Sequence, residues 1–178
     1  MPIALLRLNQ FRNFSTAEIT PCDVGFNIIC GNNGSGKTSL LEAIYYLSHG
    51  RSFRASVGKR LIQHHEAKFS IFSQLINGQG VAFPVGVEKD SHGTQRSRVD
   101  GEEAESIASI AAHLPVRLIN SQSHNIFEAG PNYRRRYVDW GLFYSFDGFL
   151  SCWRHYERAL KQRNALLKAR RPAPELSA

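Results

Sequence analysis

One short segment of the chain has the residue types needed to hold a phosphate group: Gly31-Asn32-Asn33-Gly34-Ser35-Gly36-Lys37-Thr38. It fits the pattern G-x-x-x-x-G-K-[ST]. Gly31, Gly34 and Gly36 allow backbone conformations in which several N–H groups turn toward one anion. Lys37 would bring a charge to the β- and γ-phosphates. The Thr38 hydroxyl is the expected Mg²⁺ ligand, because this hard cation prefers oxygen. The segment therefore predicts a site for ATP and Mg²⁺.

The residues on either side of this motif predict the elements that would position it. Residues 26–30 (FNIIC) form a short apolar run ending at a glycine, which is typical of a strand buried on both faces. Apolar residues then recur at helical spacing from Lys37 to Leu47. A helix beginning there would direct its N-terminal amides and positive dipole end at the bound anion. Strand, glycine-rich turn and helix together form the context that this motif requires.

The rest of the chain predicts an α/β fold. Further strands are expected at 3–8, 68–76, 81–87, 95–99 and 116–120, and a helix at 104–113. Asn77 to Gly80 is typical of a hairpin turn between two of these strands. After Pro131 two aromatic stripes at helical spacing predict a pair of packed helices, broken near Asp147-Gly148. The stripes are Tyr133, Tyr137, Trp140 and Tyr144, then Phe149, Trp153, Tyr156 and Leu160.

Composition excludes several classes of protein. With 178 residues, 42% of them hydrophobic, the chain can form one folded core. No apolar run reaches the roughly 18–20 residues that span a membrane, and the N-terminus lacks the pattern of a signal peptide. Cytoplasmic location is therefore expected. Cys22, Cys30 and Cys152 form no metal-binding pattern, and His64-His65 is the only adjacent histidine pair, so neither zinc nor iron is expected.

The formal net charge is +7, and much of the excess lies in Arg134 to Arg136 and in the stretch from Arg154 to Arg171. A basic excess suits a polyanionic partner such as nucleic acid. The same charges are equally compatible with the solvated surface of a helix.

Residues 26–44, which include the phosphate-binding segment, resemble the head of the SMC-like ABC ATPases. Within that group, further segments resemble the RecF family: 8–14 (LNQFRNF), 50–54 (GRSFR), 98–101 (RVDG) and 133–140 (YRRRYVDW). The resemblance implies a P-loop NTPase of the ABC/SMC-head type. Residues 1–130 would form an ATP-binding lobe, with a mixed β-sheet around the P-loop helix, and residues 131–178 a truncated helical lobe.

The resemblance also implies a site and partners. It adds Ser39 to the nucleotide-binding segment and places Arg12 and Asn13 near the nucleotide, in the short loop after the first strand. Gln122 would lie near the γ-phosphate, although this chain differs there from the usual family pattern. RecF proteins are ATP-dependent, nucleoid-associated DNA-binding proteins. They dimerise with ATP and act with RecO and RecR to load recombinase at gapped DNA.

Two motifs of ABC-type hydrolysis, the signature motif and the acidic Walker B strand, are not found in this sequence. RecF proteins are about twice as long, so the chain is expected to be an N-terminal fragment. Such a fragment would bind ATP weakly and would not hydrolyse it, because phosphoryl transfer to water also needs a group that orients the attacking water.

The candidates for sequence-independent contacts to DNA phosphates are Arg51, Arg54, Arg134, Arg135 and Arg136. Two other functions fit the P-loop: a kinase of a small metabolite, and an interaction module whose P-loop no longer binds nucleotide. The metabolite kinase would not predict the flanking segments 8–14 and 50–54. The interaction module would bind no nucleotide even at full length.

Overall fold

The computed structural model describes residues 2–54, 58–128 and 130–169. They form two compact units that divide between Asn120 and Ser121. The first unit contains a β-sheet and the phosphate-binding segment, and the second is helical. The division falls earlier in the chain than the boundary after residue 130 that the sequence predicts. The identification of the units as an ATP-binding lobe and a helical lobe stays a prediction, and residues 170–178 of the predicted helical lobe lie outside the described residues.

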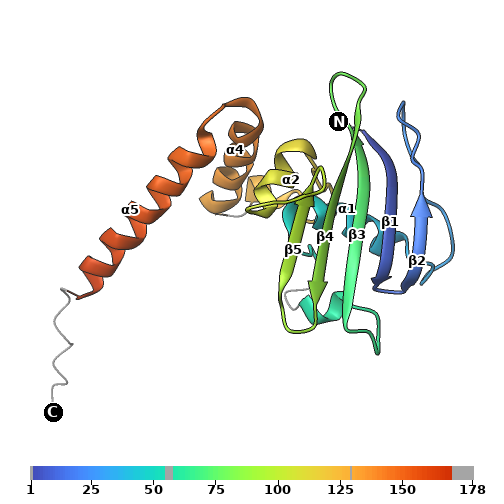
Figure 1. Ribbon diagram of the computed structural model, residues 1–178. Coiled ribbons are helices and arrows are strands. Elements are labelled where there is room, and N and C mark those ends of the chain that lie inside the picture. The colour runs from blue at the N-terminus through green and yellow to red at the C-terminus, as the bar shows by residue number, and fades with distance from the viewer. Residues whose placement is uncertain (1, 55–57, 129, 170–178) are drawn as a thin grey trace, which may run out of the picture. The chain divides into compact units, whose positions relative to one another are not determined.

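The first unit is built on a six-stranded sheet in the order β2-β1-β3-β4-β5-β6 (Figure 1). Each neighbouring pair of strands is antiparallel. The α/β class, with a sheet around the P-loop helix, is confirmed. The strands are β1 (Ile3–Phe11), β2 (Phe14–Ile19), β3 (Lys68–Ile76), β4 (Ala82–Asp90), β5 (Gln95–Val99) and β6 (Glu102–Glu103).

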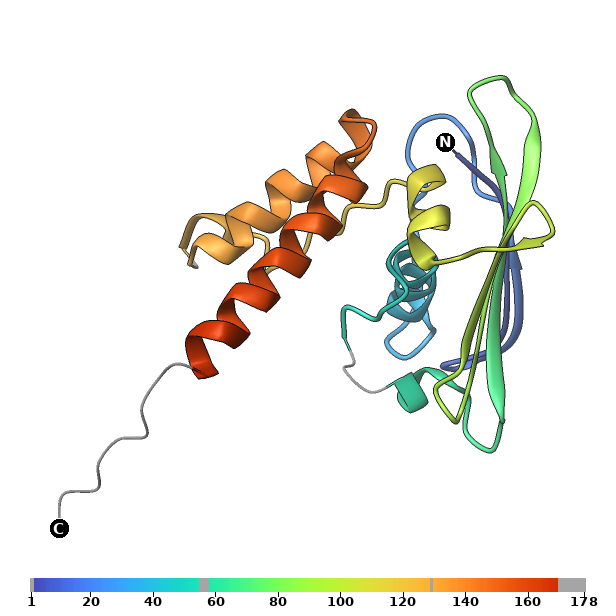
Figure 2. The same cartoon turned by 60° about the vertical axis from the view of Figure 1, so that its left-hand side comes forward.

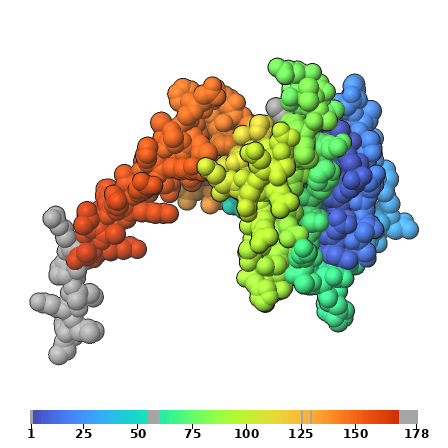
Figure 3. All heavy atoms as spheres, viewed as in Figure 1, coloured from blue at the N-terminus to red at the C-terminus, as the bar shows by residue number. Residues whose placement is uncertain are grey.

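The sheet buries one face because apolar side chains alternate along its strands. On β3, Phe69, Ile71 and Leu75 are buried, whereas the residues between them are partly or fully exposed apart from Ser73. β1 contributes Leu6 and Leu8 to the same face. The opposite face carries polar and charged side chains and is exposed in the space-filling view (Figure 3).

Helix α1 (Lys37–His49) covers the buried face of the sheet, with α2 (Ile107–His113) on the same side (Figure 2). Its buried apolar residues are Leu40, Ala43, Tyr46 and Leu47. The ring of Tyr46 meets Phe69 edge to face, with centroids 5.2 Å apart. The Tyr46 hydroxyl donates to Gln95 Oε1 at 2.7 Å, and burial raises the pKa of Tyr46 to about 12. The helix that follows the glycine loop is thereby fixed to the sheet.

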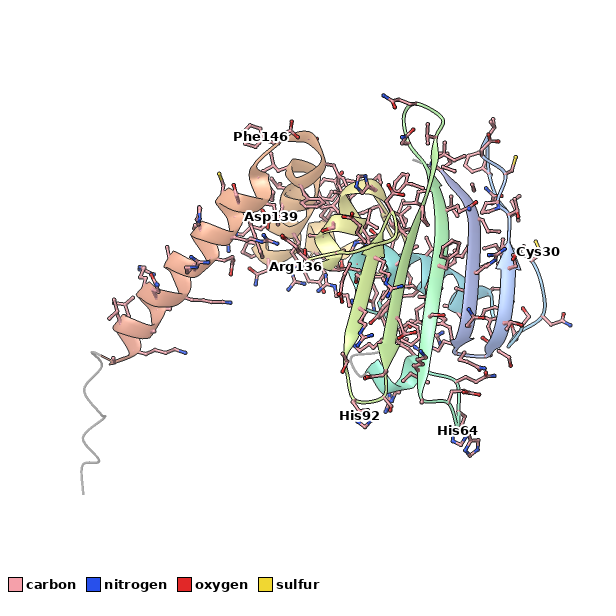
Figure 4. All side chains as sticks on the ribbon, viewed as in Figure 1. Cys30, His64, His92, Arg136, Asp139 and Phe146 are labelled. Atoms are coloured by element: carbon pink, nitrogen blue, oxygen red, sulfur yellow. The ribbon has the colours of Figure 1, made fainter. Side chains whose placement is uncertain are left out.

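Two segments predicted as buried strands are not strands. Residues 26–30 and 116–120 run without regular structure, and Phe26, Ile28 and Ile119 are 96%, 83% and 84% exposed. Cys30 lies outside the sheet, on the segment that runs beyond β2 (Figure 4). The apolar composition of these segments was read correctly, but a buried strand also needs neighbouring strands to pair with. None of the described strands pairs with either segment.

The second unit contains α3 (Asn125–Glu128), α4 (Pro131–Ser145) and α5 (Phe149–Ala169). Pro131 occupies the first turn of α4, and the break at Asp147-Gly148 is confirmed. The predicted packing of the aromatic stripes is wrong in one respect, because no described residue of α4 or α5 is buried. Tyr156 is 62% exposed. A pair of helices such as α4 and α5 contact each other along one narrow line. That contact is too narrow to bury the full width of an aromatic stripe on each helix.

Three smaller features complete the fold. α2 begins later than the helix predicted from residue 104, and the sequence reasoning did not anticipate β2 or β6. Across the described ranges no helix is long and apolar enough to cross a membrane. The same residues contain no cluster of His, Cys, Asp and Glu side chains that could hold a metal ion.

Candidate nucleotide-binding site

The predicted phosphate-binding segment forms a loop that leads directly into α1. Gly31, Gly34 and Gly36 have φ angles of 147°, 84° and 99°, which favour glycine. Gly36 is also the residue that caps α1. A Cβ atom at Gly36 would lie 2.6 Å from Cζ of Phe14 and 2.8 Å from Nδ2 of Asn13. The third glycine of the motif is therefore required both by its backbone conformation and by the close approach of the β1–β2 turn.

Lys37 closes the loop. Its Nζ donates to the carbonyl oxygens of Gly31 and Asn32, each at 2.8 Å. The ammonium group is thus held over the loop rather than extended into solvent. The first backbone N–H groups of a helix have no partner within the helix, so the N-terminus of α1 adds further donors to the same place.

A cavity of about 530 Å³ lies at this end of α1, a volume typical of small-molecule sites. Four of its lining residues are cationic: Arg12, Lys37, Arg54 and Arg60. Among the described residues that line it, none is acidic. The other lining residues are Asn13, Asn33, Gly34, Gly36, Thr38, Ser39 and Ile62. The charge and the size suit a small polyanion such as a nucleotide polyphosphate.

Arg12 reaches this cavity from the turn between β1 and β2, and its contact with a nucleotide stays a prediction. Its φ angle is 57°, a left-handed conformation that is uncommon for residues other than glycine. The guanidinium donates from Nε and Nη2 to the two carboxylate oxygens of Glu42, at 2.9 and 2.7 Å, and from Nη1 to the carbonyl of Arg60 at 2.7 Å. Backbone and side chain are therefore both fixed at the rim of the cavity.

Glu42 lies on α1 with 0% exposure and is not among the residues that line the cavity. Besides Arg12 it accepts a hydrogen bond from the Ser52 hydroxyl, and Nη1 of Arg54 lies 3.8 Å from its Oε2. Glu42 is not among the site residues that the sequence predicts. The signal that could have identified it is its spacing, because it falls three residues after Ser39 and four before Tyr46, on the buried side of the helix. A carboxylate at such a position needs a cationic partner.

The five arginines proposed to contact DNA belong to both units of the chain. Arg54 lines the cavity at the N-terminus of α1 together with Arg12, whereas Arg51 is exposed and is not among the lining residues. The remaining three lie on α4 in the second unit, where they line a separate cavity of about 890 Å³ shared with α5. Arg136 projects from α4, as does Asp139 (Figure 4). These three arginines are Arg134, Arg135 and Arg136.

Of the other predicted nucleotide-binding residues, Asn13 and Ser39 line the cavity. Gln122 belongs to the second unit, in a turn before α3, and its role near the γ-phosphate stays a prediction. Arg60 and Ile62 line the cavity although sequence reasoning did not single them out. They come from the segment around the short 3₁₀ helix Gly58–Leu61, which no local motif marks as a ligand site.

The sheet packed on a helix that follows the glycine loop, together with the solved structures of similar fold, defines the class of protein as a P-loop NTPase of the ABC/SMC-head type. One solved structure, described as "Structural biochemistry of ATP-driven dimerization and DNA stimulated activation of SMC ATPases", matches with a TM-score of 0.62 at 21% identity. It covers 78% of this chain and 98% of that chain, and at this identity it supports the fold alone.

The chain belongs to the RecF/RecN/SMC N terminal domain family, whose profile matches residues 2–138. Two relatives are each named DNA replication and repair protein RecF. The one from Coxiella burnetii (strain Dugway 5J108-111) is 46% identical over 98% of this chain and 48% of its own length. The one from Vibrio atlanticus (strain LGP32) is 40% identical over 99% of this chain and 49% of its own length. The predicted resemblance to RecF is confirmed.

The fold comparison agrees with the sequence comparison. A structure of the recombination mediator protein RecF-ATP matches with a TM-score of 0.81 and 27% identity, over 97% of this chain and 47% of that chain. A structure of RecF-ATPrS matches with a TM-score of 0.82 and 28% identity, over 94% of this chain and 45% of that chain. The chain thus spans about half the length of the curated relatives and of these structures.

Proposed function

We propose that the cavity at the N-terminus of α1 binds the polyphosphate of ATP, and that the chain serves a RecF-like DNA replication and repair protein as its nucleotide-binding half-site. The observation that carries the proposal is the cavity itself, where a glycine loop, a helix N-terminus and four cationic side chains meet. A RecF relative of known structure is described with ATP, which supports the choice of ligand.

The loop and its neighbours have distinct parts in this proposal. The backbone N–H groups between Gly34 and Ser39 would surround the phosphates, and Lys37 would exchange its loop carbonyls for phosphate oxygens. Arg12 keeps N–H groups beyond those bonded to Glu42 and Arg60, and these can face the cavity. Asn13 lies beside it.

Mg²⁺ fits the site through Thr38. This residue lines the cavity in the first turn of α1, and its hydroxyl is the kind of oxygen ligand that the ion takes. Because no described lining residue is acidic, the phosphates and water would supply the other ligands. The bound ion would neutralise charge on the phosphates. The absence of an acidic side chain among the described lining residues supports the prediction that this chain binds ATP without hydrolysing it.

A longer protein would supply what this chain lacks. The exposed apolar segments 26–30 and 116–120 would pair with strands of such a protein, which would also carry the acidic Walker B strand. The signature motif would come from the second copy in an ATP-dependent homodimer. DNA, RecO and RecR are the proposed partners of the full-length protein, and a nucleoid-associated cytoplasmic location is the corresponding proposal.

The second unit is the proposed DNA-binding surface. Arg134, Arg135 and Arg136 are exposed on α4. On α5 further exposed cations fall at helical spacing: Arg154, Arg158, Lys161 and Lys168. Contacts of these residues with DNA phosphates would be independent of sequence.

The test of nucleotide binding is a calorimetric titration of the chain with ATP and Mg²⁺. We expect saturable binding that Lys37→Ala weakens by at least about tenfold, because the lysine supplies a charge-assisted contact to phosphate. Lys68→Ala is the matched control, since Lys68 lies on β3 and pairs with Glu88 at 2.8 Å. Equal affinity of the wild-type and Lys37→Ala proteins would refute the proposal.

A further inference from the structure

We propose that Glu42 is a positioning residue: one buried carboxylate that holds two separate segments of the chain against the nucleotide cavity. The segments are the β1–β2 turn, through Arg12, and the segment after α1, through Ser52 and Arg54. The inference rests on the proposed function of the cavity as an ATP site. It adds a residue that does not line the cavity and acts through others that do.

Burial shows that the carboxylate has a specific partner rather than solvent. Glu42 is fully buried, and the Arg12 side chain is 19% exposed. Removing a carboxylate from water is costly unless hydrogen bonds and an opposite charge replace the hydration. Here Nε and Nη2 of Arg12 approach both oxygens, and the Ser52 hydroxyl adds a third donor. The arrangement is a two-pronged pair, the strong form of a charge-assisted bond.

The segment after α1 is tied to the same carboxylate. The Ser52 hydroxyl donates to Glu42 and accepts from the backbone N–H of Arg54 at 2.8 Å. This chain of bonds leads from the buried carboxylate to the backbone of Arg54, a residue that lines the cavity. Arg54 itself is 48% exposed and lies at the longer distance of 3.8 Å. Glu42 therefore holds the backbone of Arg54 more firmly than it holds the Arg54 guanidinium.

The backbone of Arg12 shows that this anchorage works against a local preference. At φ 57° a residue other than glycine is held in an uncommon conformation, which persists only where the surroundings enforce it. The enforcing bonds are those to Glu42 and Arg60, together with Arg12 N–H to the Leu61 carbonyl at 2.7 Å. Loss of Glu42 removes the two charge-assisted hydrogen bonds from the Arg12 guanidinium and leaves the bonds of Arg12 to backbone carbonyls.

Electrostatics gives Glu42 a second effect on the cavity. Arg12, Lys37, Arg54 and Arg60 line one small space and repel one another. The carboxylate beneath them offsets part of this repulsion without entering the space where phosphate would lie. Glu42→Gln keeps the size and shape of the side chain but removes its negative charge. The amide NH₂ is a donor, so it cannot accept a hydrogen bond from the Arg12 guanidinium.

The test measures ATP affinity of the full 178-residue chain in four forms: wild type, Glu42→Gln, Arg12→Lys and the double variant. We expect each single change to weaken ATP binding by about tenfold. The double variant should lose much less than the product of the two losses, because the residues act as one unit. Glu18→Gln is the control, since its pair with Arg7 is exposed on the β1–β2 hairpin.

Thermal unfolding and ATP affinity together separate a positioning role from a role in stability alone. If Glu42 only stabilised the fold, Glu42→Gln would have a lower unfolding midpoint but the same Kd for ATP well below that midpoint. That result would overturn the proposal. If Glu42→Gln fails to fold, Ser52→Ala replaces it, because it removes one donor while the carboxylate keeps Arg12. We expect a several-fold loss of affinity for Ser52→Ala, and unchanged affinity would overturn the proposal in that case.

Two outcomes separate this inference from the function on which it rests. If the wild type binds ATP and Lys37→Ala abolishes binding while Glu42→Gln binds normally, only the role of Glu42 fails. If the wild type binds no ATP, the proposed function fails and the role of Glu42 fails with it. If the loss of ATP affinity in the double variant equals the product of the two single losses, Glu42 and Arg12 act independently, and this would also contradict the proposed role of Glu42.

Discussion

Arg12 and Glu42, thirty residues apart in sequence, face each other with Nε 2.9 Å from Oε2 and Nη2 2.7 Å from Oε1. The pair joins the β1–β2 turn to the middle of α1, so the sheet and the helix meet at the rim of the nucleotide cavity. A substitution in the β1–β2 turn would therefore alter the position of α1, and a substitution in α1 would alter the turn. The glycine loop alone does not explain how the cavity keeps its shape.

Gly36→Ala is expected to destabilise the chain more than Gly34→Ala. Both glycines have positive φ, at 99° and 84°, so each alanine carries a backbone strain of about 1–2 kcal/mol. At Gly36 the new Cβ would also lie 2.6 Å from Phe14, whereas Gly34 has open space around it. Thermal unfolding of both variants checks the difference. Equal midpoints would show that the approach of Phe14 to Gly36 does not matter.

Phe69→Ala is expected to lower the free energy of unfolding by about 3–5 kcal/mol. Phe69 is 1% exposed and meets both Phe11 and Tyr46 edge to face, at centroid distances of 5.1 and 5.2 Å. Phe72 lies on the same strand, on the opposite and partly exposed face. Phe72→Ala should therefore cost less than half as much in urea unfolding. A larger loss of unfolding free energy for Phe72→Ala than for Phe69→Ala would contradict the assignment of the core to the face of the sheet that carries Phe69.

His49 is expected to make stability fall as the solution becomes acidic. Burial lowers the pKa of His49; the hydrogen bond with the Tyr45 carbonyl opposes this shift, and the charges of Arg51 and Arg117 add to it. The unfolded chain therefore binds a proton more readily, so the contribution is fully present above the ordinary histidine pKa of about 6.5. It is lost as the pH falls through the lower folded-state value.

The measurement for His49 is urea unfolding at pH 7.5 and at mildly acidic pH, for the wild type and His49→Gln. The variant should lose less stability across this range, because glutamine does not titrate. His92→Gln is the control, since His92 is exposed in the β4–β5 turn. A pH dependence that is identical in the wild type and His49→Gln would contradict the assignment.

DNA binding is expected to depend steeply on salt and on the second unit. Replacing Arg134, Arg135 and Arg136 together by alanine should weaken duplex binding at low salt. It should also reduce the slope of log affinity against log salt by up to about 0.9 for each lost phosphate contact. Fluorescence anisotropy with a labelled duplex measures both quantities. An unchanged slope would remove these arginines from the DNA-binding surface.

Sequence alone predicted the parts of the molecule that local signals encode. The glycine spacing from Gly31 to Gly36 identifies the loop, the period after Lys37 identifies α1, and Asn77-Gly78 identifies the β3–β4 hairpin. Each depends on residues that are near one another in the chain. The strand at 95–99 was predicted with the bounds that the structure shows.

The features that escaped prediction depend on residues far apart in the chain. Glu42 is recognisable as a site residue only once Arg12 is known to lie beside it. Residues 26–30 are as apolar as a buried strand, but composition does not reveal whether partner strands are present. β2 is only six residues long, and its place in the sheet comes from pairing with β1 across the Arg12-Asn13 turn. For Arg54 the DNA contact stays a prediction, and its charge alone does not reveal that it lines this cavity.

The most direct test of the central claim is competition at the nucleotide cavity by the phosphate part of ATP alone. With a fluorescent ATP analogue bound to the chain, inorganic tripolyphosphate should displace it in the presence of Mg²⁺, and adenosine should displace it poorly. This follows because cations and backbone N–H groups dominate the described lining. Displacement by adenosine but not by tripolyphosphate would contradict the account of a phosphate-binding loop.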